Sequence, residues 1–159
     1  TETEEDLDGI IRLCNNILAL GKRSAKRHVQ INVTVSTFVP KPHTPFQWCK
    51  MDDVDSLNSK LKILKKGISK IDNVFITTDV PKWAYIQGIL SRGDRRVGNL
   101  IESAYKADGD WKRAMRETAF DSDFYAIRER QLDEMLPWSY IDVGVKKELL
   151  IKEYKEAMA

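Results

Sequence analysis

The stretch from residue 29 to residue 47 constrains the fold of this chain more than any other. Its first half alternates strictly, with four β-branched residues on one face (Val29, Ile31, Val33, Val35) and four polar residues on the other (Gln30, Asn32, Thr34, Ser36). Three prolines then follow at Pro40, Pro42 and Pro45, and each restricts its own backbone and that of the residue before it. We therefore expect a strand over residues 29–37 with one apolar and one polar face, followed by a stiff loop.

Composition sets the class of protein. The chain has 159 residues, 42% of them apolar and 31% charged, which fits one globular domain or a large piece of one. Its net charge of +2 gives no strong pull toward nucleic acid or membrane, and no apolar run is long enough to cross a bilayer. Cys14 and Cys49 have no metal-ligand spacing, so we expect a reduced, cytoplasmic protein. Because the chain begins at Thr1 without a methionine, we expect it to be a fragment of a longer protein or a chain trimmed at its start.

Helices are predicted on both sides of the strand. The first runs over residues 3–20, with Thr3 and Asp6 as an approximate capping box and Gly21 as its stop. A second helix over residues 54–71 leads to a short strand over residues 74–78, which its composition predicts to be buried. A helix between two strands favours a parallel pair, although an antiparallel strand with one wet face is the alternative.

The second half of the chain is predicted to be helical. Helices are expected from Pro81 to Gly93, from Asp94 to Gly109, from a cap at Asp110, from Ser122 or Asp123 to Pro137, and over residues 146–158. The apolar positions that we expect to face inward on these helices include Trp83, Ile86, Ile89, Leu90, Val97, Leu100, Ile101, Ala104, Phe124 and Met135.

A ligand site is predicted around the polar face of the first strand. In parallel β/α proteins ligands bind beyond the carboxyl ends of the strands, where Lys41 and His43 lie on the stiff loop. A lone histidine is more often a surface loop residue than a general acid or an anchor, so both interpretations of His43 stay open. The chain has no Ser-His-Asp order, no glycine-rich phosphate loop and no zinc spacing, and no catalytic residue or metal ligand is assigned. Arg92-Gly-Asp94 is interpreted as a helix end followed by a helix start.

Three stretches together resemble the radical S-adenosylmethionine enzymes. Residues 1–7 (TETEEDL) look like the segment after the Gly-Leu-Pro or Gly-Phe-Pro turn that follows the fifth barrel strand. Residues 33–48 (VTVSTFVPKPHTPFQW) resemble the sixth strand and its exit loop. Residues 86–97 (IQGILSRGDRRV) resemble a segment downstream of the barrel in the subgroup with an upstream cobalamin-binding-type domain. The resemblance covers nearly the whole chain.

The resemblance implies an α/β fold in two parts. Residues 1–79 would be the C-terminal part of a partial (β/α)6 TIM-type barrel, and residues 80–159 a mostly helical extension. The parent would be an iron-sulfur oxidoreductase that uses a four-iron four-sulfur (4Fe-4S) cluster to form a 5′-deoxyadenosyl radical, which abstracts hydrogen from a substrate that the resemblance does not name. Cobalamin is a further cofactor that the subgroup suggests. The nucleoside would lie near Phe38 and Val39, with Asn32, Thr34 and Ser36 deeper in the lumen, and Lys41 and His43 would contact substrate.

The chain also departs from the family. The C-x3-C-x2-C loop that holds the cluster is absent, and Cys14 and Cys49 do not match it. We therefore expect the chain alone to be inactive and to bind no iron or other cofactor. A barrel cut before its sixth strand would expose a strand edge, so self-association is expected. The alternative is a non-catalytic module that binds RNA or a protein through the basic segments Lys22–His28 and Arg92–Arg96.

Overall fold

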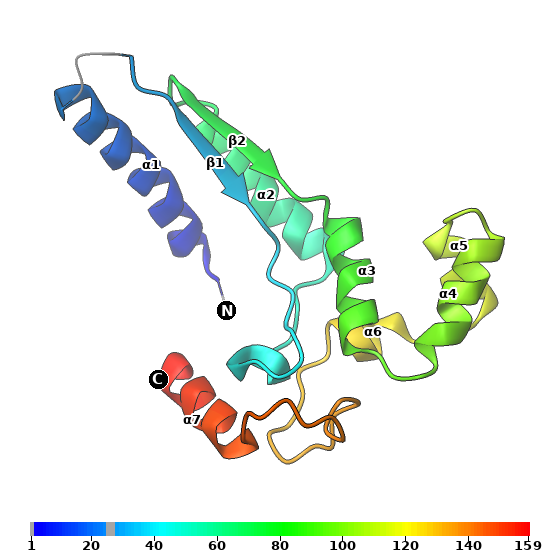
Figure 1. Cartoon of the computed structure of the whole chain (residues 1–159). Coiled ribbons are helices and arrows are strands. Elements are labelled where there is room, and N and C mark those ends of the chain that lie inside the picture. The colour runs from blue at the N-terminus through cyan, green and yellow to red at the C-terminus, as the bar shows by residue number, and fades with distance from the viewer. Residues whose placement is uncertain (1, 25–27) are drawn as a thin grey trace. The chain divides into compact units, whose positions relative to one another are not determined.

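The computed structural model describes residues 2–24 and 28–159, which form two compact units (Figure 1). The strand unit comprises Thr1–Thr37 and Val54–Pro81, and the helical unit comprises Phe38–Asp53 and Lys82–Ala159. The strand unit contains α1 (Glu4–Ser24), β1 (Ile31–Val35), α2 (Val54–Ile68) and β2 (Val74–Thr78). The helical unit contains the 3-10 helix η1 (Pro45–Trp48), α3 (Pro81–Arg92, whose first residue is assigned to the strand unit), α4 (Val97–Lys106), α5 (Trp111–Glu117), α6 (Ser122–Ala126) and α7 (Lys147–Met158).

The strand unit is built on a parallel pair of strands. β1 and β2 pair with Ile31 opposite Val74 and Val35 opposite Thr78, and α2 connects them. The predicted α/β class and parallel pairing are therefore confirmed, because a helical crossover is what joins parallel neighbours. Over the part of the chain that the structure describes, the sheet has these two strands, so one edge of each strand is unpaired. A partial barrel is not visible in a two-stranded sheet and remains a prediction.

Both helices of the strand unit cover the same face of the sheet. The core joins residues from all four elements and their flanks: Ile11, Cys14, Leu18, Val29, Ile31, Val33, Ile68, Ile71, Val74 and Ile76. The strand residues in this set are the alternate ones that the period of two placed together. The two helices approach closely at Gly67, where an added Cβ would overlap the Ile11 side chain.

The first helix begins as predicted but ends later. The Thr3 backbone N–H donates to the Asp6 carboxylate (2.8 Å), and the Asp6 N–H donates to the Thr3 hydroxyl (3.4 Å), which forms the capping box. The prediction that Gly21 stops the helix is wrong, because α1 continues to Ser24. Gly21 instead allows a close approach, since a Cβ there would lie 2.9 Å from Val29 Cγ1.

The helical unit has two apolar clusters. One joins Ile89, Val97, Leu100, Ala104, Ala114 and Ala126, and the other joins Trp48, Leu136, Trp138 and Leu150. Two predictions about helix termini are confirmed between α4 and α5, namely the stop at Gly109 and the cap at Asp110. Gly109 has φ +84° and donates to the Ala104 carbonyl (2.9 Å), and Asp110 caps α5 by accepting from the Arg113 N–H (3.0 Å).

Other expectations for this half are wrong. The helix predicted to reach Pro137 stops at Ala126, and its cap is Asp121, which accepts from the Phe124 N–H (3.1 Å). From residue 127 onward the chain does not continue this helix, and its side chains and backbone make the polar contacts described below. Several apolar residues that were expected inward are exposed instead: Trp83 (55%), Leu90 (43%), Ile101 (48%), Phe124 (42%) and Met135 (87%). Short helices covered by few neighbours bury a narrower stripe than their apolar pattern indicates.

No helix within residues 2–24 and 28–159 combines the length and the apolar character that crossing a bilayer requires.

Candidate functional site

The open face of the sheet is the first candidate. Asn32 pairs with Phe75 and Thr34 with Thr77 across the two strands, and all four side chains are exposed. They point away from the face that the helices cover, because alternate strand residues point to opposite sides. Asn32 and Thr34 are thus placed where the alternation predicted. Ser36, the next alternate residue after β1, is exposed as well.

Sequence reasoning missed the contribution of the second strand. The segment 74–78 was expected to be buried, but only Val74 is, and Phe75 is 56% exposed. The signal was available, since Phe75 and Thr77 occupy the alternate positions of a five-residue strand. Its apolar composition hid that alternation. The open face therefore offers two hydroxyls, one carboxamide and one aromatic ring within two paired strands.

The carboxyl ends of the two strands are held together by Asp79. Its backbone N–H donates to the Val35 carbonyl (3.2 Å), and its carboxylate accepts from the Thr37 N–H (3.3 Å). At the opposite end of β1, the Gln30 amide donates to the Asn32 side-chain oxygen (3.2 Å). The Asn32 amide nitrogen and the Thr34 hydroxyl are the polar side-chain groups of β1 left for a ligand, since no hydrogen bond joins them to any residue that the structure describes.

The remaining predicted site residues belong to the helical unit. Phe38 is 52% exposed and meets Phe46 edge to face, with ring centroids 6.0 Å apart. Val39 is buried among the core residues, and its place near a nucleoside remains a prediction. Lys41 and His43 are half-buried, and partial burial lowers the pKa of the Lys41 ammonium.

His43 has a structural role in its loop. Its φ is +57°, and its backbone N–H donates to the Gln47 side-chain oxygen (3.1 Å). The same oxygen accepts from the Trp138 indole N–H (2.6 Å), and Gln47 is buried. A buried amide oxygen that accepts two hydrogen bonds fixes both segments. This anchoring explains the main chain at His43 and leaves any role of its imidazole in substrate binding a prediction.

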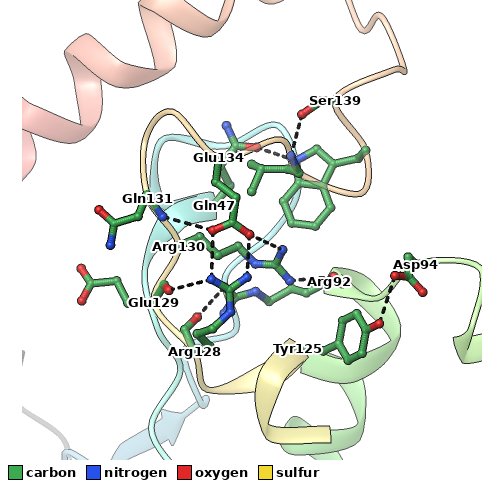
Figure 2. Close-up of polar contacts among 12 residues, drawn as sticks. Gln47, Arg92, Asp94, Tyr125, Arg128, Glu129, Arg130, Gln131, Glu134 and Ser139 are labelled. Carbon is green, nitrogen blue, oxygen red and sulfur yellow. Dashed lines mark hydrogen bonds and ion pairs between the residues drawn. The ribbon is translucent and has the colours of Figure 1, made fainter. Parts of the chain in front are cut away.

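A second polar site lies in the helical unit, around three arginines and one glutamate (Figure 2). We name Arg92, Arg128, Arg130 and Glu134 the arginine cluster. Arg92 is fully buried, and its guanidinium donates to the carbonyl oxygens of Ala126 (2.9 Å) and Arg128 (3.2 Å). Arg130 is 4% exposed and donates to the Arg92 carbonyl (3.0 Å). Each buried arginine thus satisfies carbonyls where a helix, α6 or α3, ends.

Glu134 is the carboxylate of the cluster. It accepts two hydrogen bonds from the Arg128 guanidinium, one of them 2.9 Å long, and lies 3.8 Å from the Arg130 guanidinium. The Arg130 guanidinium also lies over the Trp138 ring, 5.3 Å from its centroid. Figure 2 shows the Arg128 and Arg130 side chains converging on Glu134. The segment that was expected to continue as helix is therefore organised by these contacts.

The cluster holds more positive than negative charge. Burial lowers the pKa of Arg92 to about 10, and repulsion from Arg130 and Arg128 adds to the effect. Burial also lowers the pKa of Arg130, whereas the hydrogen bonds to Glu134 raise that of Arg128. The Nε–H groups of all three arginines are buried without a hydrogen-bond partner among the described residues. Buried charges are stable only when they are paired or hydrogen-bonded, and here backbone carbonyls and Glu134 supply those partners for three arginines.

Metal ligands do not gather in the described part of the chain. No group of three or more histidine, cysteine, aspartate or glutamate side chains there could hold a metal ion. Cys14 is buried in the strand unit, and Cys49 is half-buried in the helical unit, where burial raises the pKa of its thiol. The two cysteines of the sequence do not by themselves supply the set of thiolates that holds an iron-sulfur cluster.

The basic segments of the alternative hypothesis are engaged in part, since Lys22 and Arg23 are exposed whereas other members have partners. Residues 25–27 lie outside the described residues, and the His28 ring bonds the Asn73 side chain (2.8 Å). In the second segment Arg92 is buried, and Arg96 is hydrogen-bonded to Asp94 (2.6 Å). Arg95 is left as the exposed arginine of that segment without such a partner.

The chain is similar to a much longer archaeal protein. It is 27% identical over 103 residues to the uncharacterized protein MJ0966 of Methanocaldococcus jannaschii, a match that covers 64% of this chain and 21% of that relative. The chain thus spans about a fifth of the length of the relative that it matches. No family model matches the chain, and no solved structure does.

Proposed function

We propose that this chain is the C-terminal part of a radical S-adenosylmethionine enzyme. Residues 1–79 would contribute part of the barrel wall, and residues 80–159 a helical extension. The observation that carries the proposal is the sheet of the strand unit, which has α1 and α2 on one face and exposed polar side chains on the other. The length of the similar archaeal protein, which extends far beyond the matched part, agrees with a larger parent.

The arrangement of helices is the one that a barrel wall requires. In β/α barrels successive helices all lie outside the sheet, although in doubly wound sheets successive helices also share one face until the strand order reverses. Here the helix before β1 and the helix after it pack on the same face. The opposite face would then be the lumen of the complete barrel. Ligand pockets combine apolar and aromatic side chains with a few polar groups that orient the ligand, and this face carries the Phe75 ring beside Asn32, Thr34 and Thr77.

The residues of the open face would bind and orient the nucleoside. The Thr34 and Thr77 hydroxyls and the Asn32 amide can donate to or accept from ribose hydroxyls and adenine edges. The exposed ring of Phe75 can stack on the base. When bound, S-adenosylmethionine supplies the 5′-deoxyadenosyl group, and its chemistry is that of the cofactor. The cluster cysteines would come from another part of the parent, and no step is assigned to cysteines of this chain.

The test uses the full-length protein, anaerobic and reduced, with 5′-deoxyadenosine formation as the readout. Thr34→Val keeps the side-chain size and removes one hydroxyl, so it should slow S-adenosylmethionine cleavage about tenfold or more, because a buried ligand group is left unpaired. Thr78→Val is the matched control, since Thr78 lies on the face toward the helices, and should leave the rate unchanged. Absence of 5′-deoxyadenosine from the unaltered protein, or of the three-cysteine loop from its sequence, would refute the proposal.

A further inference from the structure

A hollow of about 750 Å³ opens in the helical unit next to the arginine cluster. It is lined by Gly93, Asp94, Arg95, Arg96, Pro137 and Tyr140. Gly93 directly follows the buried Arg92, and Pro137 directly precedes Trp138, the ring against which Arg130 lies. The two segments that line the hollow are therefore those that hold the buried cations.

Arg95 is the charged side chain of this hollow that is left without a partner among the described residues. Its side chain is exposed, and no hydrogen bond or ion pair joins it to any residue within 2–24 or 28–159. The neighbouring Arg96 differs, because its guanidinium is bound to the Asp94 carboxylate, which also accepts from the Tyr125 hydroxyl (3.0 Å). Asp94 is thus already neutralised and oriented by other groups. Burial lowers the pKa of Arg130 in the cluster, and the Asp94 carboxylate is among the weaker influences that oppose this shift.

The charges around the hollow favour an anion. Arg92 of the arginine cluster directly precedes the lining residue Gly93, and Glu134 is the carboxylate that contacts Arg128 and Arg130 of that cluster. The same segment also carries Glu129 and Asp133, but both are exposed and screened by water. The hydrogen bonds to backbone carbonyls fix the conformations of the buried arginine side chains, so these side chains contribute a fixed positive potential.

We propose that this hollow binds the phosphate group of a small nucleotide-like ligand, with Arg95 as the side chain that contacts the phosphate. A guanidinium presents a planar fork of donors that matches two phosphate oxygens. Tyr140, which is 86% exposed, and Pro137 offer apolar surface for the base or sugar that carries the phosphate. The site uses no residue of the open sheet face, so it does not depend on the function proposed above.

The experiment measures binding of inorganic phosphate, AMP and adenosine to the 159-residue chain by calorimetry at constant ionic strength. We expect saturable binding of phosphate, tighter binding of AMP, and none of adenosine. Arg95→Gln should weaken phosphate and AMP binding by about tenfold or more, because a charge-assisted hydrogen bond is lost. Arg116→Gln is the matched control, since Arg116 is an exposed arginine of α5 outside the hollow. Tyr140→Ala should weaken AMP binding and leave phosphate binding unchanged.

Four outcomes would overturn the proposal. Neither phosphate nor AMP binds saturably, or Arg95→Gln binds both as well as the unaltered chain does. Arg116→Gln weakens binding as much as Arg95→Gln, which would show attraction to net charge instead of a site. Adenosine binds as tightly as AMP, which would remove the phosphate from recognition. Because Arg95 is exposed and contacts no described side chain by hydrogen bond or ion pair, its variant should melt at the same temperature as the unaltered chain.

Discussion

The strand unit and the helical unit bury different kinds of side chain. In the strand unit the core consists of aliphatic residues and Cys14 from two helices and two strands. The buried polar residues of the described chain, Gln47, Arg92, Ser122 and Arg130, all belong to the helical unit. An aliphatic core tolerates exchange of similar side chains, whereas a buried cation depends on particular partners. The helical unit should therefore be the more sensitive of the two to single substitutions at polar positions.

The largest effect is expected from Arg92→Ala. This change removes a fully buried guanidinium and leaves the Ala126 and Arg128 carbonyls without their donor, which should cost about 3–5 kcal/mol of unfolding free energy. Denaturant unfolding measures it. Arg116→Ala, at an exposed position in the same unit, should cost less than about 0.5 kcal/mol. Equal losses for the two variants would contradict a special role of the buried arginine.

Gly67→Ala should be the most damaging small change in the strand unit. The added methyl group would overlap the Ile11 side chain where α1 meets α2, so we expect a loss of about 1–3 kcal/mol from overpacking. Gly98→Ala in α4 is the control, because a Cβ there meets nothing within 4 Å. That variant should gain up to about 0.5–1 kcal/mol from helix propensity. Melting curves of both variants separate packing from propensity.

Substitutions on the two faces of β1 should also differ in their effect on stability, by a smaller amount. Val33→Ala removes two methyl groups from the half-buried face that packs on the helices and should cost about 1–2 kcal/mol. Thr34→Val lies on the open face and should leave the melting temperature of the chain nearly unchanged. Early melting of Thr34→Val together with a silent Val33→Ala would mean that the faces are assigned the wrong way round.

The smallest effect concerns the pH dependence of the helical unit. Hydrogen bonds from Arg128 lower the pKa of Glu134 below its ordinary value, so the folded state binds this proton less readily than the unfolded state. The stabilisation is fully present above the unfolded glutamate pKa, about 4.3, and is lost as the pH falls through the lower folded value. Glu134→Gln should cost about 1 kcal/mol at pH 7 and reduce the difference in stability between pH 6 and pH 3. An unchanged acid limb in a pH series of melting temperatures would contradict this.

Periodicity in the sequence was enough to predict the architecture of the strand unit. The alternation of Val33 with Thr34 places one residue toward the helices and the other outward, and the structure has both in those positions. A strand face and a helix stripe depend on local geometry, so they can be read from spacing alone. The same holds for the capping box at Thr3 and for the stop at Gly109, because both depend on neighbouring residues. The alternation in β2 was equally local, and only its apolar composition concealed the exposure of Phe75.

Tertiary contacts decided the helical unit and the second candidate site. Nothing near Arg92 in the sequence indicates that its guanidinium will hold carbonyls at positions 126 and 128, or that Trp138 will donate to Gln47, 91 residues earlier. Those contacts end the predicted helix at Ala126 and expose apolar positions such as Met135. A local pattern cannot encode them, because a buried charge is stable only if distant segments supply its partners. The spacing of the residues thus determined which faces exist, and the long-range polar contacts determined which charges were left for a ligand.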